Sequence, residues 1–388
     1  MGRKEKAAYL DAIRKRYQKA KRREKKAILD EFCAVCRYNR KYAIRLLGKQ
    51  KKKLKAKRGR KPVYADPRFL KVLQSIWKAA DFMCSRRLLV VIPIWLPFYE
   101  QSVEPLDADV RSRLLAVSRA TLDRVLKPLR VRCRKGLCGT KPGSMLRNQI
   151  PIRTDNWDIT RPGFMEADTV AHCGTSLAGE FVWSLIMTDI HTAWTEGRAV
   201  WNKGSQGVIE QVKDIERHIP FVLRGFDCDN GSEFLNYHLE RYFAVRKDPV
   251  KFTRSRPYKK NDNAHVEQKN WAQARHLLGY DRIENPDTLP LINDLYANEW
   301  SLYQNHFCPS LKLKSKIRIG SRYRKTYASP KTPYQRILES PDISSDVKQT
   351  LKLTHGSLNP FQLKKTIERK LNAIFKLVTV TSFVRHRI

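Results

Sequence analysis

Residues 164–170 read Phe-Met-Glu-Ala-Asp-Thr-Val, residues 226–234 read Phe-Asp-Cys-Asp-Asn-Gly-Ser-Glu-Phe, and residues 261–270 read Asn-Asp-Asn-Ala-His-Val-Glu-Gln-Lys-Asn. These stretches contain Asp168, Asp229 and Glu267. Alternation of side chains predicts that Asp168 lies on a strand, and an apolar run that ends in Asp-Asn-Gly predicts that Asp229 lies where a second strand meets a turn. Helical spacing after Ala264 places Glu267 on a helix. We therefore expect these three carboxylates to converge.

Converging carboxylates need cations, because like charges a few ångströms apart raise one another's pKa values. Mg²⁺ or Mn²⁺ prefers oxygen ligands, and two such ions about 4 Å apart can activate the attacking oxygen and stabilise the leaving oxygen of a phosphoryl displacement. The motifs therefore predict a metal-dependent phosphodiester enzyme with Asp168, Asp229 and Glu267 as ligands. Glu166 and Asp227 are the alternatives for the first two positions.

The order of these motifs, with Arg256-Pro257-Tyr258 before the third, resembles the catalytic core of the retroviral-integrase superfamily, which includes the insertion-sequence transposases with an Asp-Asp-Glu triad. The resemblance covers residues 155–310. It implies a ribonuclease-H-like α/β fold with a mixed five-stranded sheet, two Mg²⁺ or Mn²⁺ ions, and cleavage and strand transfer of DNA ends. The gap from Asp229 to Glu267 is slightly longer than the commonest spacing, and Ala264-His265 stands where Gly and a small or basic residue are usual.

Within this core the sequence predicts alternating elements. We expect strands over residues 164–172, 180–189, 192–200, 221–227 and 249–254. We expect helices over residues 205–218, 231–245, 264–278 and about 287–305. This order is the one that the resemblance requires.

The chain has 388 residues and a net charge of +39, which is unevenly distributed. The net charge is +19 over residues 1–60, +10 over residues 61–150, −4 over residues 151–310 and +14 over residues 311–388. An acidic core bracketed by basic segments fits a metal centre flanked by phosphate-binding surfaces. Together with the core motifs, this distribution makes double-stranded DNA the expected partner, although solubility or membrane attraction can explain any single basic run. The resemblance implies that this DNA includes the element's terminal inverted repeats and a target.

Residues 1–60 are expected to form a basic helix-turn-helix, in which Asn39 caps the second helix. Residues 61–134 repeat the pattern as a second helical DNA-binding module, and residues 135–154 are expected to be a linker. Plain helical hairpins are the alternative for both modules. The DNA-binding candidates in these segments are Arg40, Lys41, Arg45, Arg58, Arg60, Arg119, Arg124 and Lys127.

Further DNA-binding candidates lie beside the third motif. They are Arg254, Arg256, Lys259, Lys260, Lys269 and Arg275. We expect them to hold phosphates near the scissile bond. The alternative is that they are solvated charges of a loop and a helix.

Residues 311–388 are predicted to be a basic C-terminal region for DNA binding or assembly. Its first part is either a strand-rich arm on DNA or a charged tail. Residues 360–377 have a helical pattern, so the small terminal barrel found in many relatives is not expected.

Two other patterns in the sequence have simple explanations. Cys33 and Cys36 have a spacing seen in zinc sites, but no His precedes His172, so we expect two small buried residues on one helix. The apolar run of residues 88–98 is too short to span a bilayer and is interrupted by proline, and no signal-peptide core follows Met1. We expect a protein of the bacterial cytosol or nucleoid.

The leading hypothesis is therefore a DNA transposase that acts as a dimer or larger homo-oligomer, because two DNA ends must be joined in one event. A nuclease that stops after hydrolysis is one alternative. A DNA-binding regulator with a decayed core is the other.

Overall fold

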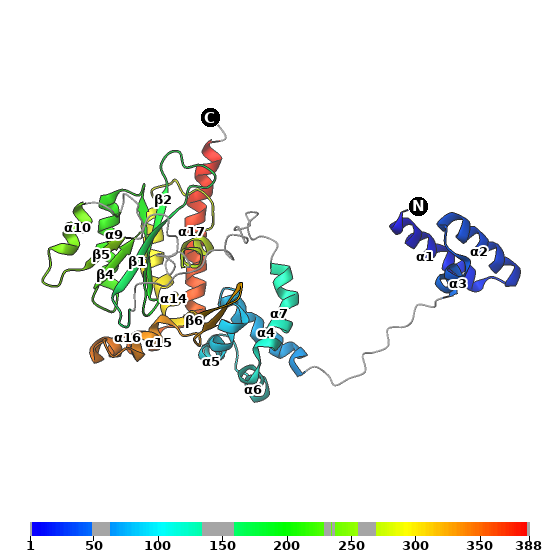
Figure 1. Ribbon diagram of the computed structural model, residues 1–388, viewed down its shortest axis with the longest axis horizontal. Helices are drawn as coiled ribbons and strands as arrows, with labels where there is room; N and C mark the ends of the chain where they lie inside the picture. Colours follow the sequence, from blue (N-terminus) through cyan, green and yellow to red (C-terminus); the bar gives the residue numbers. More distant parts are fainter. Residues whose placement is uncertain are drawn as a thin grey trace. The chain divides into compact units, whose positions relative to one another are not determined.

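The computed structural model describes residues 2–48, 63–133, 159–228, 234, 237–254 and 269–385. The chain forms two compact units, Met1–Pro62 and Val63–Ile388. The first unit has its own hydrophobic core, and the second contains the sheet and most of the helices (Figure 1).

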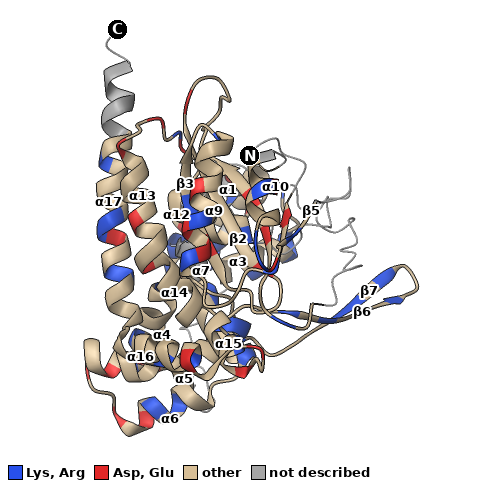
Figure 2. Ribbon diagram, turned by 90° about the vertical axis from the view of Figure 1, so that its left-hand side faces the viewer, with Lys and Arg blue, Asp and Glu red and all other residues tan. Residues whose placement is uncertain are grey.

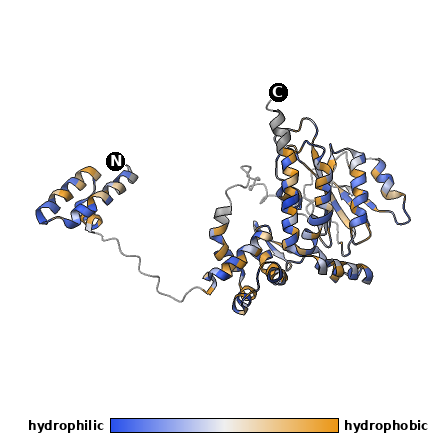
Figure 3. Cartoon of the chain, turned by 180° about the vertical axis from the view of Figure 1, so that it is seen from behind, coloured by the Kyte–Doolittle hydropathy of each residue, from blue (hydrophilic) through white to orange (hydrophobic). Residues whose placement is uncertain are grey.

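The first unit is a bundle of α1 (Arg3–Lys19), α2 (Arg22–Cys36) and α3 (Arg40–Gly48). Its core includes Ile13, Phe32 and Leu47, and hydrophilic and hydrophobic residues alternate along its helices (Figure 3). Lys41 N donates to Asn39 Oδ1 at 3.0 Å, so the predicted cap of α3 is confirmed. α1 and α2 are separate helices, because the backbone is extended at Ala20 and a new helix starts at Arg22.

The second unit begins with a short 3-10 turn, η1 (Val63–Ala65), and four helices: α4 (Pro67–Ala79), α5 (Ser85–Ser102), α6 (Ala108–Ala116) and α7 (Arg119–Cys133). Trp77 is buried, and its Nε1 donates to Met83 O at 3.0 Å. Thr121 N donates to Ser118 Oγ at 3.2 Å, so Ser118 caps the start of α7.

The expected interruption of the apolar run is wrong, because α5 continues through Pro93 and Pro97. Both prolines are exposed, whereas Trp95, Tyr99 and the rest of the opposite face are buried. Proline inside a helix removes a backbone hydrogen bond, at a cost of about 3 kcal/mol. Burial of the apolar face offsets that cost here, since helices in proteins depend mainly on tertiary packing.

The sheet has the strand order β3-β2-β1-β4-β5. Its strands are β1 (Phe164–Ala171), β2 (Val182–Asp189), β3 (Thr195–Trp201), β4 (Gly225–Cys228) and β5 (Lys251–Arg254). β1, β2 and β3 are antiparallel neighbours, whereas β4 and β5 run parallel to β1. This mixed arrangement is the ribonuclease-H-like order, so the predicted fold class of the core is confirmed.

Helices cover both faces of the sheet (Figure 1). On one face lie α9 (Ser205–His218), with the bounds predicted from the sequence, and α10 (Tyr237–Ala244). The other face is covered by the π-helical turn η2 (Trp271–Arg275), α12 (His276–Leu278), α13 (Thr288–Leu295), the π-helical turn η3 (Tyr296–Trp300) and α14 (Ser301–Phe307).

The predicted strand over residues 221–227 starts later, at Gly225. Leu223 is buried but Val222 is 66% exposed, so the apolar run begins as a loop. Arg224 N and Gly225 N both donate to Gly163 O, at 2.7 and 3.0 Å, and pairing with β1 begins at Gly225. Tertiary pairing therefore decides where the strand starts.

The C-terminal region has a hairpin of β6 (Leu313–Ile319) and β7 (Arg322–Tyr327), then α15 (Pro333–Glu339), α16 (Ser345–Ser357) and α17 (Pro360–Arg385). The predicted terminal helix is confirmed and extends further than expected. Ile367 and Ile374 of α17 share one core cluster with α4, α5, α13 and η3. No helix in the described ranges is long and apolar enough to cross a membrane.

Candidate active site

Asp168 lies near the middle of β1, the central strand of the sheet, and its side chain is half-buried. Its Oδ1 accepts a hydrogen bond from Thr169 N at 2.7 Å. Its Oδ2 accepts one from Asn270 Nδ2 at 2.6 Å. The carboxylate is therefore held by its own strand and by the helical segment that follows the third motif.

Alternation along β1 explains why Asp168 faces this segment. Met165 and Ala167 point into the core cluster beneath α9. Asp168 and Val170 belong to the opposite face, where Val170 packs against Ala274 of η2. The predicted strand thus presents Asp168 toward the helices that come after Glu267 in the chain.

The register of β4 against β1 pairs Glu166 with Asp227, and Ala167 with Cys228. Both acidic residues are buried, and Asp227 Oδ1 accepts a hydrogen bond from Thr253 Oγ1 at 2.6 Å. These two carboxylates are the alternative ligands, and their pair directly precedes the last pair of the β1–β4 ladder, Ala167 with Cys228. Asp229, the residue bonded to Cys228, lies outside the described residues.

Glu267 also lies outside the described residues, which resume at Lys269. Asn270, three positions after Glu267, was not singled out by the sequence reasoning. Its spacing of three from Glu267 on an expected helix was the available signal, because residues three apart are neighbours on a helix surface. Its Oδ1 is buried and has no hydrogen-bond partner among the described atoms.

Asp168 and Asn270 together present oxygen atoms of the kind that hard divalent cations prefer. These are the carboxylate oxygens of Asp168 and the amide oxygen of Asn270, which has no hydrogen-bond partner among the residues that the structure describes. Within the described ranges no group of three or more His, Cys, Asp and Glu side chains can hold a metal ion, and two of the predicted ligands fall outside those ranges. The donor atoms present fit the predicted cations, which remain a prediction.

A tight turn between β2 and β3 lies next to this segment. Its base is Asp189, which accepts hydrogen bonds from Thr192 N at 2.6 Å and from Gly163 N at 2.9 Å. Burial raises the pKa of this carboxyl group. Ala193 adopts a left-handed φ of 63°.

Three cations from distant parts of the chain donate to the carbonyl oxygens of this turn. Lys312 Nζ donates to His191 O, Arg336 Nη1 to Thr192 O at 3.1 Å, and Lys269 Nζ to Ala193 O at 3.4 Å. Burial, with Arg87 and Arg336 nearby, lowers the pKa of Lys269 to about 7. The predicted phosphate ligand Lys269 thus contacts the protein interior, two residues from Glu267.

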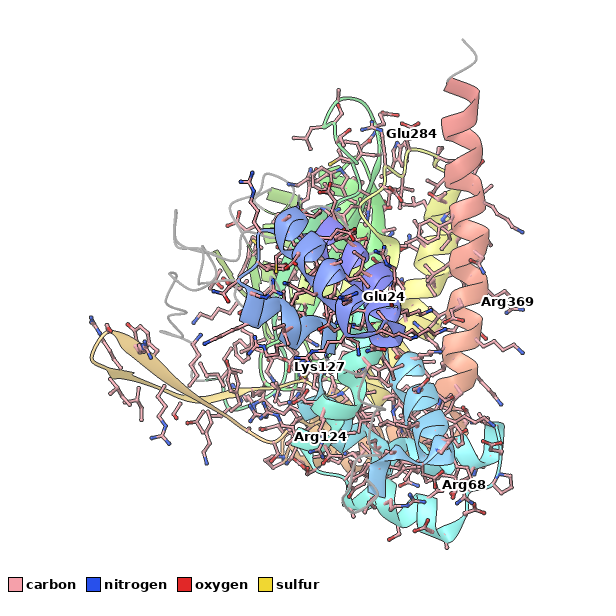
Figure 4. The ribbon with its side chains drawn as sticks, turned by 90° about the vertical axis from the view of Figure 1, so that its right-hand side faces the viewer. Glu24, Arg68, Arg124, Lys127, Glu284 and Arg369 are labelled. Atoms are coloured by element: carbon pink, nitrogen blue, oxygen red, sulfur yellow. The ribbon has the colours of Figure 1, made fainter. Side chains whose placement is uncertain are left out.

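The other candidates for DNA binding lie in several places. In α3, Arg40 pairs with Asp30, Lys41 is exposed, and the Arg45 guanidinium lies 5.0 Å from the centre of the Tyr42 ring. In α7, Arg119, Arg124 and Lys127 are exposed, and Figure 4 labels the last two. Arg275 is half-buried and lies 5.1 Å from the centre of the Tyr280 ring.

Six candidates fall wholly or partly outside the described residues. Arg58, Arg60, Arg256, Lys259 and Lys260 lie outside the described residues, and only the backbone of Arg254 is described. Cys33 and Cys36 lie on α2, where Cys36 is buried in the bundle core and Cys33 packs against it. His172 is buried, and its Nε2 lies 2.8 Å from Ser184 Oγ.

A scan against protein-family models found no match. The crystal structure of the catalytic core domain of bovine immunodeficiency virus (BIV) integrase matches 46% of the chain and 94% of its own length at 14% identity, with a TM-score of 0.27. That superposition is too weak to add to the strand order described above. The uncharacterized protein y4rM of Sinorhizobium fredii is 40% identical over 331 residues, 84% of this chain and 93% of that protein. The chain therefore belongs to the family of y4rM.

Proposed function

We propose that the chain is a DNA transposase that binds the ends of a mobile element, cleaves them and joins them to target DNA, with Asp168, Asp229 and Glu267 as ligands of two Mg²⁺ or Mn²⁺ ions. The ribonuclease-H-like fold and the three acidic motifs support this proposal. Element ends and target DNA are the proposed partners, and a dimer or larger homo-oligomer is the proposed assembly.

The observation that carries the proposal is the 2.6 Å hydrogen bond from Asn270 Nδ2 to Asp168 Oδ2. Asp168 and Asn270 are 102 residues apart in the chain, yet the first and third motifs meet at this contact. Cys228, the neighbour of Asp229, pairs with Ala167, the neighbour of Asp168. Consecutive Cα atoms are about 3.8 Å apart, so Cys228 of the second motif lies opposite the immediate neighbour of Asp168. The second and third motifs therefore each have a residue close to Asp168.

In this proposal the residues of the chain position the reacting groups. Asn270 and Thr169 N orient the carboxylate of Asp168, as outer-shell partners orient the ligands of metal sites. When bound, the two ions would activate a water or a DNA 3′-hydroxyl and stabilise the leaving oxygen. No Ser or Tyr nucleophile is needed, since the hydroxyl of the DNA end attacks the target phosphate directly.

The test is strand transfer by the full-length chain. Inverted sequences flanking the gene supply the candidate ends, which are used as pre-cleaved duplexes with a circular plasmid target and Mg²⁺. Joined products are expected. Asp168→Asn, Asp229→Asn and Glu267→Gln should each abolish joining without loss of DNA binding. Glu240→Gln, which changes an exposed carboxylate on α10, is the matched control and should join normally.

The same assay separates the alternatives. Cleaved ends without joined products would identify a nuclease. DNA binding without any metal-dependent cleavage would identify a regulator. Activity that survives in all three carboxylate variants would refute the proposed site.

A further inference from the structure

The β6–β7 hairpin differs from the other strands of the second unit because both of its faces are open to solvent. Every residue of β7 is exposed. In β6, Ile317 is 57% exposed and Ile319 is 58% exposed. Two views at right angles to Figure 1 show the hairpin standing away from the helices and the sheet (Figures 2 and 4). An isolated two-stranded ribbon is marginally stable in water, so this one is expected to have a binding partner.

The hairpin carries only positive charge. Residues 313–327 contain six Lys and Arg residues and no Asp or Glu. Cross-strand pairing sets Ile317 opposite Arg324, Arg318 opposite Tyr323, and Ile319 opposite Arg322. Directly opposite residues share a face of an antiparallel pair, so each face combines a cation with an apolar or aromatic side chain. Figure 2 shows Lys and Arg along the ribbon with no acidic residue between them.

The base of the hairpin is anchored beside the candidate active site. Lys312, the residue before β6, donates to His191 O, and Ala328 N donates to Lys312 O at 2.9 Å. On the other side, Arg86 Nη2 of α5 donates to Tyr327 O at 3.2 Å. The turn that accepts the hydrogen bond from Lys312 also accepts one from Lys269, which is two positions from Glu267 in the sequence. The ribbon therefore starts from the same turn that supports the third motif.

We infer that the β6–β7 hairpin is a DNA-binding ribbon that lies in a groove of duplex DNA and guides it toward Asp168. The proposed partner is duplex DNA, because its negative phosphates complement the positive charge of the hairpin. This assignment rests on the proposed function. The major groove admits a two-stranded ribbon. Seven residues of strand span about 23 Å, enough to follow a groove between phosphate backbones. Arg318, Arg322, Arg324 and Lys325 contact phosphates, and the exposed isoleucines face sugars or base edges.

The test compares two variants with the same change in net charge. The hairpin variant is Arg318→Gln/Arg322→Gln/Arg324→Gln/Lys325→Gln. The control variant is Lys352→Gln/Lys365→Gln/Arg369→Gln/Lys376→Gln, on α16 and α17. These control residues are also exposed, and Arg369 points away from α17 in Figure 4. Glutamine keeps the length of each side chain and removes the charge.

Binding of the full-length protein to a fluorescent 40-base-pair duplex of arbitrary sequence is measured by anisotropy in EDTA, from 50 to 300 mM KCl. The slope of log K against log salt is about −0.9 for each phosphate that is neutralised. The hairpin variant should bind at least about tenfold more weakly at 100 mM KCl and lose about 3.6 units of slope, about 0.9 for each of its four cations. The control variant should keep the wild-type slope. Far-ultraviolet circular dichroism confirms that both variants are folded.

Equal losses in the two variants, or no loss in the hairpin variant, would overturn the inference. A change in sedimentation with unchanged DNA affinity would overturn it as well, because the ribbon would then pair with a second copy of the chain. EDTA blocks metal-dependent chemistry, so this binding test is independent of the triad. If the carboxylate variants lose joining but the hairpin variant binds DNA normally, only the ribbon proposal is refuted. If the carboxylate variants still join DNA but the hairpin variant binds it weakly, only the transposase proposal is refuted.

Discussion

The contact between Asn270 and Asp168 gives a quantitative prediction. Asn270→Ala removes a 2.6 Å hydrogen bond to a carboxylate oxygen. Hydrogen bonds to charged groups contribute about 1.5–3 kcal/mol. If that energy holds Asp168 in its reactive orientation, its loss corresponds to a roughly 10- to 150-fold lower rate of strand transfer. The concentration of Mg²⁺ that gives half-maximal activity should rise in the same variant, because Asp168 is no longer oriented toward the metal.

The same substitution should leave the fold nearly as stable as before. The Asn270 Oδ1 atom is buried without a partner, and such an atom costs about 1–3 kcal/mol, so its removal offsets the lost hydrogen bond. The thermal midpoint should therefore stay within about 4 °C of the wild-type value. If Asn270 positions Asp168, its replacement by alanine should therefore lower the rate of strand transfer without lowering the thermal midpoint.

Two further variants sharpen this test. Asn270→Asp places a second carboxyl group beside Asp168, where like charges disfavour ionisation of both, and it should lower the rate more than alanine does. Gln273→Ala is the matched control, because this buried amide on the same segment bonds to Gln304 at 3.5 Å rather than to Asp168. It should keep full activity. An Asn270→Ala protein with wild-type rate and Mg²⁺ requirement would refute the reasoning.

Three other predictions concern the fold. Burial lowers the pKa of His172 and of His306 to about 3, against about 6.5 in the unfolded chain, so between these values only the unfolded chain binds the two protons. Each histidine should therefore lower the free energy of unfolding by about 1.4 kcal/mol for each pH unit between pH 6 and pH 4. A urea midpoint that does not change over this range would contradict the prediction. Arg282→Ala should increase hydrogen exchange across the β1–β2 loop, because the guanidinium donates to four of its carbonyl oxygens, and unchanged exchange would count against that role. A chain of residues 63–388 should unfold at the midpoint of the main transition of the full chain, since Met1–Pro62 is a separate unit, and an aggregated or unfolded product would show otherwise.

Much of the fold could be predicted from local pattern. The helix over residues 205–218 was predicted with its observed bounds, because a regular apolar stripe faces the sheet. The caps at Asn39 and Ser118 were predictable because their side chains accept hydrogen bonds from backbone groups two or three residues away. In each case the determining interaction lies within a few turns of the chain.

The errors came from long-range packing. The start of β4 depends on pairing with β1, and the continuation of α5 past Pro93 depends on the buried face on the other side of the helix. The π-helical turn after Asn270 was expected to be ordinary helix. Such turns are frequent at functional sites, and nothing in a single sequence marks them.

The candidate site was accessible from sequence at the level of motifs. Asp168 could be predicted because a strand that alternates faces presents it opposite Met165 and Ala167. Asn270 was missed, because its role depends on a contact with a residue far away in the chain. The inward position of Lys269, toward the turn at Ala193, was hidden for the same reason.

The most direct test of the account is a crystal structure of the protein soaked in Mn²⁺, with anomalous difference maps recorded with and without DNA. The account predicts manganese peaks within coordination distance of carboxylate oxygens of Asp168, Asp229 and Glu267. Carboxylates on separate surfaces, or manganese bound elsewhere while Asp168 contacts only protein atoms, would contradict it.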